Sequence, residues 1–173
     1  MFKRSLVLAI SAVLVLTGCS SSSEEAAPSG SQSSDAAAQT GTPVSVEVTG
    51  EYGSQPVVAI TPGDPVTELE VTDVIVGTGD PLPAGATLTA HYVGYGGATG
   101  EMFDASWVRG EPATFPLPNV ILGWQEGLVG MQVGGRRLLV IPAELGYGNN
   151  PPPGSGIEPG ETLIFVVDLV SFE

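Results

Sequence analysis

Apolar and polar residues alternate with a period of two along several short stretches of the chain, which is typical of half-buried β-strands. The clearest stretch runs from Thr87 to Tyr95. Successive side chains of a strand point to opposite faces, so we expect Tyr92 in the core and His91, the only histidine, on the outer face. By the same pattern, further strands are predicted at residues 44–48, 57–60, 69–75, 101–104, 134–142 and 162–172.

One stretch, residues 120–131, has a helical period instead. Its apolar side chains recur at i, i+4, i+8 and i+11, which predicts a short amphipathic helix with Asn119 as its N-cap. Gly123 inside it costs roughly 1 kcal/mol relative to alanine, which is usually tolerated where another segment approaches the backbone closely. The apolar positions are Val120, Trp124, Leu128 and Met131.

The order of these elements predicts the fold class. Antiparallel strands with one short helix late in the chain indicate an α+β fold, a curved antiparallel β-sheet, or half-barrel, wrapped over the helix. The glycine-rich stretch 94–100 could suggest a phosphate-binding loop, but such loops open directly into a helix. Because a return strand at 101–104 follows instead, we interpret it as a hairpin turn.

The first eighteen residues have the pattern of an export signal. Lys3 and Arg4 give a basic start, and an apolar run too short to span a membrane follows at residues 6–16. The next residues, Leu16-Thr17-Gly18-Cys19, resemble the lipobox of bacterial lipoproteins. This resemblance implies cleavage before Cys19 and a diacylglyceryl anchor on it, at the extracytoplasmic face of the cell membrane; an ordinary secretory signal is the alternative.

Composition divides the remaining chain. Residues 19–43 are mostly Ser, Ala, Gly, Gln and acidic residues, which predicts a flexible tether behind the lipidated Cys19. We expect an extended or β extension at 44–67 and one folded domain at 68–173.

Charge and residue counts exclude several function classes. The formal net charge is −14, with five basic and nineteen acidic residues, so we expect no nucleic-acid partner and no membrane contact beyond the anchor. A single histidine and a single cysteine cannot supply a metal site or a disulfide, and His91 has no partners for a catalytic triad. No cofactor is therefore expected.

Ordered motifs from about Glu68 to Glu173 resemble the FKBP-type peptidyl-prolyl cis-trans isomerases, the macrolide-binding immunophilins. So many matches in family order make chance similarity improbable. The motifs are His91-Tyr92-Val93-Gly94, Phe103-Asp104, Val120-Ile121, Gly123-Trp124-Gln125-Glu126-Gly127, Ile141-Pro142, Gly146-Tyr147-Gly148 and Thr162-Leu163-Ile164-Phe165.

The resemblance implies an apolar pocket with Trp124 at its floor. Asp104 and the Tyr147 hydroxyl would form a polar rim, and the backbone N–H of Ile121 would donate a hydrogen bond to the ligand. As implied catalytic residues we take Tyr92, Phe103, Asp104, Trp124, Tyr147 and Phe165, and as substrate-binding residues Phe115, Val120, Ile121 and Ile157.

The chain departs from the family pattern at two places. Ala113 stands where relatives usually have an aromatic residue, and the stretch from Phe115 to Val120 is about two residues shorter. In the loop 149–156, an aromatic or histidine position near Pro152 has no counterpart. We therefore expect a pocket that is more open on one side.

The implied function is rotation of X-Pro peptide bonds in exported polypeptides by a monomeric enzyme, with a macrolide as a further ligand. Such a reaction needs no nucleophile or base, because an apolar pocket that removes water from the amide favours the twisted transition state. Two alternatives stay open. The domain could be a non-catalytic chaperone or binding module, or a structural lipoprotein whose segment 44–60 recruits a partner by strand addition.

Overall fold

The computed structural model describes residues 41–173. The predictions for the export signal, for Cys19 and for most of the tether lie outside these residues. Within the described part, no helix is long and apolar enough to cross a membrane.

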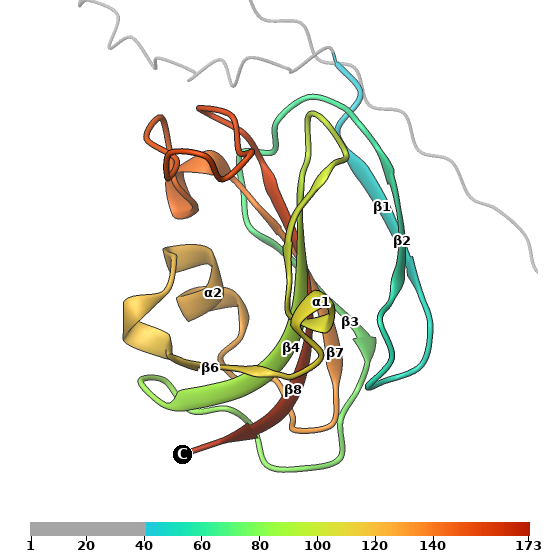
Figure 1. The fold of residues 1–173 in the computed structure, drawn as a ribbon, viewed down its shortest axis with the longest axis vertical. Helices are drawn as coiled ribbons and strands as arrows, with labels where there is room; N and C mark the ends of the chain where they lie inside the picture. Colours follow the sequence, from blue (N-terminus) through green and yellow to red (C-terminus); the bar gives the residue numbers. More distant parts are fainter. Residues whose placement is uncertain (1–40) are drawn as a thin grey trace, which may run out of the picture. The chain divides into compact units, whose positions relative to one another are not determined.

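Six strands form one antiparallel sheet in the order β3-β7-β8-β4-β5, with β6 also paired to β4 (Figure 1). This curved sheet with short helices confirms the predicted α+β class. The strands are β3 (Glu70–Ile75), β4 (Thr87–Gly96), β5 (Met102–Ala105), β6 (Ala113–Pro116), β7 (Arg136–Ile141) and β8 (Leu163–Phe172).

Strand β4 organises the sheet. One of its edges pairs with β8, and the other pairs first with β6 and then with β5. Between β5 and β6 the chain leaves this edge to form one helical turn, α1 (Ser106–Arg109), which the sequence pattern did not predict. Tyr92 of β4 is therefore flanked by side chains of β5, α1 and β6.

The inner face of the sheet packs against α2 (Leu122–Gly127). Tyr92 and Phe165 contribute to this core as the alternation predicted, together with Trp124 and Leu128. Gly123 explains the close packing, because a Cβ at this position would lie only 2.4 Å from Cγ2 of Ile141 on β7. The predicted close approach to the helix backbone is confirmed.

The helix itself is shorter than predicted. It begins at Leu122 with Ile121 as N-cap, and no side chain caps it. Asn119 is therefore not the N-cap; it ends a 3-10 turn, η1 (Leu117–Asn119), which Pro118 favours. A second such turn, η2 (Ala143–Leu145), follows β7.

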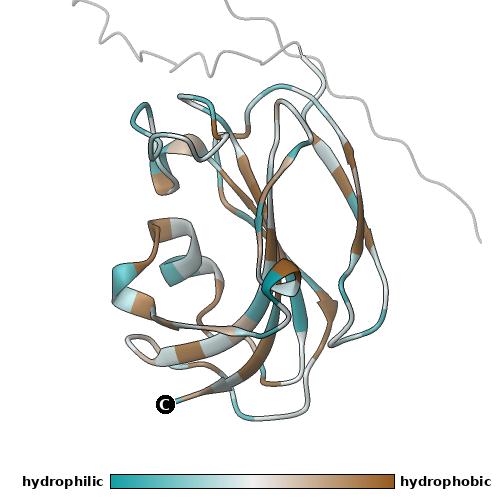
Figure 2. Cartoon of the chain, viewed as in Figure 1, coloured by the Kyte–Doolittle hydropathy of each residue, from teal (hydrophilic) through white to brown (hydrophobic). Residues whose placement is uncertain are grey.

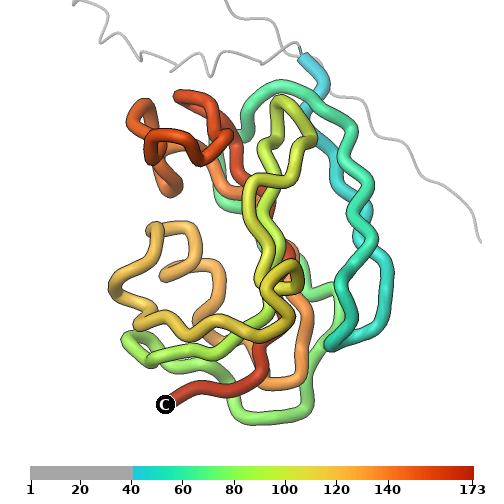
Figure 3. The backbone as a smooth tube through the Cα atoms, in the orientation of Figure 1, coloured from blue at the N-terminus to red at the C-terminus, as the bar shows by residue number. Residues whose placement is uncertain are grey.

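Residues 41–67 add a second layer to the sheet. β1 (Ser45–Thr49) and β2 (Val57–Thr61) form an antiparallel hairpin that runs along the outer face of the sheet (Figures 1 and 3). Alternate hairpin residues face the sheet, so both strands predicted in this region are confirmed. They pack on a second buried cluster that includes Val44, Val66, Val93, Leu138, Val140, Ile164 and Val166. Figure 2 shows hydrophobic segments, in brown, along both the hairpin and the sheet.

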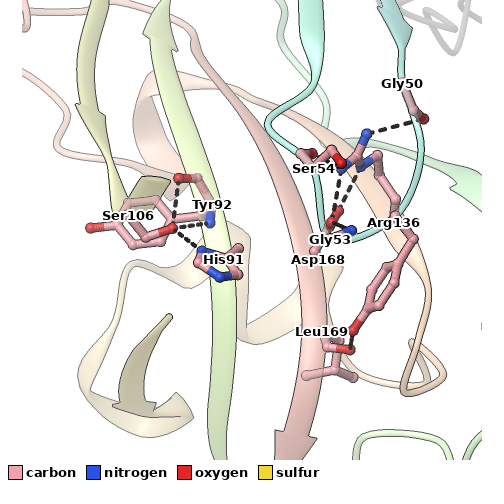
Figure 4. Close-up of polar contacts among 10 residues, drawn as sticks. Gly50, Gly53, Ser54, His91, Tyr92, Ser106, Arg136, Asp168 and Leu169 are labelled. Carbon is pink, nitrogen blue, oxygen red and sulfur yellow. Dashed lines mark hydrogen bonds and ion pairs between the residues drawn. The ribbon is translucent and has the colours of Figure 1, made fainter. Parts of the chain in front are cut away.

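Buried charges hold the hairpin turn. Arg136 and Asp168, cross-strand partners on β7 and β8, are fully buried and paired, with Nε and Oδ1 2.6 Å apart (Figure 4). Arg136 also donates to the carbonyl oxygens of Gly50 (3.2 Å) and Ser54 (2.6 Å), and Asp168 accepts from the N–H of Gly53 (2.7 Å). Nη1 and Nη2 of Arg136 and Oδ2 of Asp168 thus fasten the hairpin turn, while Nε of Arg136 and Oδ1 of Asp168 hold the pair together.

The hairpin changes the outer face of β4. The prediction that His91 lies on the face opposite Tyr92 is confirmed, but this face is not open to solvent. Val93 is fully buried, and the His91 ring is half-buried and stacked on Trp107 with centroids 5.0 Å apart. The alternation showed which face each side chain takes, but not that a second layer covers the outer one.

Candidate functional site

A cavity of about 300 Å³ opens between α2, η1, β5 and the loop after η2. Its lining is mainly aromatic and aliphatic, with one carboxylate. The residues that line it are Tyr92, Phe103, Asp104, Phe115, Asn119, Val120, Ile121, Trp124, Tyr147 and Phe165.

Trp124 is the most buried of these side chains, with 3% of its surface exposed. Three rings meet it nearly edge to face, at centroid distances of 5.5 Å for Tyr92, 5.6 Å for Phe115 and 5.3 Å for Phe165. This is the arrangement that aromatic quadrupoles favour. The indole ring is therefore held rigidly within an apolar wall.

Gly94 allows two of these rings to pack closely. A Cβ at this position would come within 2.6 Å of the Phe103 ring and 2.8 Å of the Phe165 ring. The rings contact each other edge to face, with centroids 5.5 Å apart. The glycine of the His-Tyr-Val-Gly motif thus makes room for two of the pocket walls.

The polar side of the cavity is a three-residue network. The Tyr92 hydroxyl donates to Asp104, and Arg109 reaches both groups, with its Nη1 2.7 Å from Asp104 Oδ1 and its Nη2 2.7 Å from the Tyr92 oxygen. The guanidinium also lies over the Tyr92 ring, 5.5 Å from its centroid. Both Asp104 and Arg109 are close to half exposed, so this network faces the entrance.

The network keeps Asp104 charged. Partial burial alone would raise the pKa of Asp104, but hydrogen bonds from Tyr92 and Arg109 and the Arg109 charge outweigh it, so the pKa lies below its usual value. Burial, the Asp104 hydrogen bond and the Asp104 charge raise the pKa of Tyr92, although Arg109 opposes them. Burial, and then the Asp104 charge, raise the pKa of Tyr147. At neutral pH the site therefore presents a carboxylate beside two phenols.

Ser106 attaches α1 to the sheet and so places Arg109. Its buried hydroxyl accepts from the N–H of Tyr92 (2.8 Å), lies 3.3 Å from the Tyr92 carbonyl oxygen, and shares a hydrogen bond with Nδ1 of His91 (3.0 Å; Figure 4). Because Ser106 begins α1 and Arg109 ends it, this contact places the backbone of Arg109, whose guanidinium is then held by Asp104 and Tyr92.

Two of the polar groups expected from the sequence to contact a ligand remain available to it. The Ile121 N–H and the Tyr147 hydroxyl make no hydrogen bond within residues 41–173. Tyr147 is 37% exposed. The expected donor at Ile121 and the expected rim hydroxyl are therefore unoccupied by other residues of the described chain.

The structure brings together all the predicted pocket residues except Ile157. That side chain packs partly buried against the core and does not line the cavity, so the wall position expected for it is not observed. Ala113 likewise lies outside the lining. The sequence interpretation missed Arg109; the available signal was an isolated arginine five residues after Asp104 in a very acidic chain.

A larger hollow, of about 600 Å³, lies elsewhere. It contains no aromatic residue and two acidic ones, Asp64 and Glu144, and none of the motif residues lines it. The aromatic cavity is therefore the candidate site.

Comparison with known proteins agrees with this geometry. The family described as "FKBP-type peptidyl-prolyl cis-trans isomerase" matches residues 79–170. The "FK506-binding protein" of Streptomyces anulatus is 52% identical over 63% of this chain and 90% of its own length. The "Probable FK506-binding protein" of Corynebacterium glutamicum is 47% identical over 68% and 98%. The crystal structure of FkpA from Escherichia coli, with 41% identity, superposes with a TM-score of 0.57 over 62% of this chain and 49% of that one.

Proposed function

The chain belongs to the FKBP-type peptidyl-prolyl cis-trans isomerase family, and from this premise we propose that its aromatic cavity rotates X-Pro bonds in exported polypeptides. The observation that carries the proposal is the cavity itself. Three aromatic rings, those of Tyr92, Phe115 and Phe165, pack around Trp124. A fourth ring, that of Phe103, packs on Phe165, and Asp104 and Tyr147 stand at the rim. No atom in this cavity needs to form a covalent bond with the substrate.

The chemistry follows from amide resonance. Rotation about the peptide bond is opposed by roughly 18 to 20 kcal/mol, and the planar ground state carries more charge separation than the twisted transition state. Water stabilises the planar form more strongly, so a pocket that excludes water from the amide lowers the barrier. In this proposal Trp124 and the surrounding rings exclude water, while Asp104, Tyr147 and the Ile121 N–H orient the peptide.

The direct test is catalysis of a proline-limited refolding reaction by the chain lacking residues 1–19. We expect the slow phase of refolding, which normally lasts tens to hundreds of seconds, to accelerate in proportion to enzyme concentration. An unchanged slow phase together with suppressed aggregation would support the non-catalytic chaperone instead. Calorimetric titration of the same preparation with a macrolide tests whether the cavity binds the second ligand that the family resemblance implies.

We propose further that Cys19 carries a lipid and holds the protein at the extracytoplasmic face of the cell membrane. The support is the sequence Leu16-Thr17-Gly18-Cys19 after a basic start and a short apolar run. Metabolic labelling with a fatty acid should mark the wild-type chain but not Cys19→Ala. A wild-type chain that is exported yet carries no lipid would favour the ordinary secretory signal.

A monomer is part of this proposal. Gel filtration with light scattering on the chain lacking residues 1–19 should give a mass of one copy. A concentration-dependent larger mass would contradict it.

A further inference from the structure

Gln125, on α2, does not line the cavity, yet it contacts the segment that does. Its side-chain Nε2 donates to the carbonyl oxygen of Val120 at 2.8 Å and lies 3.5 Å from that of Pro118. Its backbone N–H donates to the carbonyl oxygen of Ile121 at 3.2 Å. Gln125 therefore bonds to the carbonyl oxygens of two successive residues, Val120 through its side chain and Ile121 through its backbone.

The first of these contacts determines where a donor points. The carbonyl of Val120 and the N–H of Ile121 belong to one planar trans peptide unit, so they point in opposite directions. A hydrogen bond that holds this carbonyl toward Gln125 therefore aims the N–H of Ile121 away from it. Ile121 lines the cavity, and its N–H makes no hydrogen bond within the described residues.

Few other hydrogen bonds hold this peptide unit, although the side chains of Val120 and Ile121 pack partly buried against the core. Ile121 is the N-cap of α2 and has no capping side chain. The preceding Val120 is joined to η1 only by a long backbone hydrogen bond, 3.4 Å from its N–H to the Leu117 carbonyl oxygen. The orientation of the unit therefore depends on the side chain of Gln125.

We infer that Gln125 is a positioning residue that aims the Ile121 N–H at a carbonyl group of the bound peptide. The inference rests on the proposed function, because it assumes that an X-Pro peptide occupies the cavity. Beyond the proposed function, it identifies Gln125 as the residue that makes the Ile121 N–H available to the substrate. Gln125 acts through the peptide unit and does not touch the substrate.

The test compares kcat and KM for an X-Pro tetrapeptide in Gln125→Met, which keeps the side-chain length but loses the donor, with the wild type. The N–H contact exists in both the planar and the twisted substrate, so its loss should raise KM about three- to ten-fold and leave kcat within two-fold. Gln125→Lys keeps a donor and should stay near the wild-type KM. Glu126→Gln, at the exposed neighbouring position, is the matched control.

Each outcome decides the matter. A KM within two-fold of wild type in Gln125→Met, or an equal rise in the Met and Lys variants, overturns the inference. A fall in kcat with unchanged KM also overturns it. If Gln125→Met does not fold, as judged by thermal melting, Gln125→Ala takes its place. A wild type without activity contradicts the proposed function itself, whereas an active wild type with insensitive variants contradicts only the role of Gln125.

Discussion

Asp104 and Tyr147 stand at the same rim but are held very differently. Asp104 is bonded to Tyr92 and Arg109, whereas the Tyr147 hydroxyl has no partner within the described residues. The first is fixed before a substrate arrives, and the second is free to bond to it. Mutation of each residue should therefore have a different effect.

Tyr147→Phe removes a hydroxyl that makes no internal hydrogen bond. We expect isomerisation of an X-Pro peptide to slow by about five-fold, with the melting temperature unchanged, because one hydrogen bond to the substrate is lost. Phe165→Ala is the contrasting variant: it removes a core ring that is 5% exposed and should cost about 3 to 5 kcal/mol of stability. Full activity in a folded Tyr147→Phe protein would remove Tyr147 from the mechanism.

Arg109→Leu removes the charge that stabilises ionised Asp104. The pKa of Asp104 is lower in the folded protein than in the unfolded chain, so ionised Asp104 stabilises the folded state. This stabilisation is present above the pKa of the unfolded chain, about 3.9, and is lost as the pH falls through the pKa of the folded protein. Without Arg109, the pKa of Asp104 in the folded protein rises toward its ordinary value, and less stability is lost at acidic pH. Melting temperatures measured from pH 5 to pH 2 should therefore fall less steeply in Arg109→Leu. Arg109→Lys keeps the charge and should resemble the wild type; identical slopes in all three proteins would contradict the assignment.

At the level of elements, α2 and the β1–β2 hairpin lie on opposite faces of the same sheet. α2 lies close to β7 because of Gly123 and Gly127. Arg137, also on β7, donates to the carbonyl oxygen of Gly127 at the end of α2 (2.8 Å) and pairs with Asp73 of β3 (2.7 Å). The hairpin is joined to the sheet by the neighbouring Arg136. Two successive arginines of β7 thus fasten one element on each face.

Gly123→Ala should destabilise the protein although alanine favours helices. The added Cβ would lie 2.4 Å from Ile141 Cγ2, and overpacking of this kind costs about 1 to 3 kcal/mol, whereas the gain in helix propensity is about 1 kcal/mol. The urea midpoint should fall in the single variant. In a cycle with Ile141→Ala, which removes the clashing carbon, the cost of Gly123→Ala should largely disappear; strict additivity would show that the contact is not the cause.

Arg136→Met leaves Asp168 buried without its cation, which costs about 3 to 5 kcal/mol in comparable cases. Arg136 also holds the turn at Gly50 and Ser54, so the hairpin should open more often than the main sheet. Hydrogen exchange should show faster exchange of β1 and β2 amides than of β4 and β8 amides. Equal acceleration in both regions would mean that the pair stabilises the fold as a whole and not the hairpin.

At the scale of the whole molecule, positive charge is almost completely neutralised. The described residues contain no lysine, and their three arginines are all paired with aspartates. The other carboxylates of this part of the chain have no cation within salt-bridge distance among the described residues. An X-Pro segment therefore approaches a strongly negative domain.

The negative electrostatic potential of the domain should favour cationic substrates. At low ionic strength, kcat/KM should be higher for a tetrapeptide flanked by lysines than for the same peptide flanked by glutamates, because opposite charges increase the rate of encounter. The difference should shrink as salt is raised from about 10 mM to about 1 M, where the screening length falls from about 30 Å to about 3 Å. Equal values for the two peptides at low salt would show that the field does not reach the site.

The sequence by itself determined seven of the eight strands, the fold class and most of the cavity, but it did not predict β6, a short strand that ends at Pro116. Strand positions could be read because burial of one face leaves a period-two pattern, and this pattern located both the inner face of β4 and the hairpin strands. The motif residues could be placed together because their order and types match a family, and nine of the ten predicted pocket residues line one cavity.

Only the tertiary structure decided the rest, because it depends on contacts between residues far apart in the chain. Val93 on the outer face of β4 is buried since residues 45–61 fold back over it, and no local pattern near Val93 shows this. α2 is short because it begins only after Ile121 and ends at Gly127, which helical periodicity cannot reveal. Arg109 joins the site through α1, a single turn too short to leave a periodic signal, and Ile157 remains outside because its loop packs on the core.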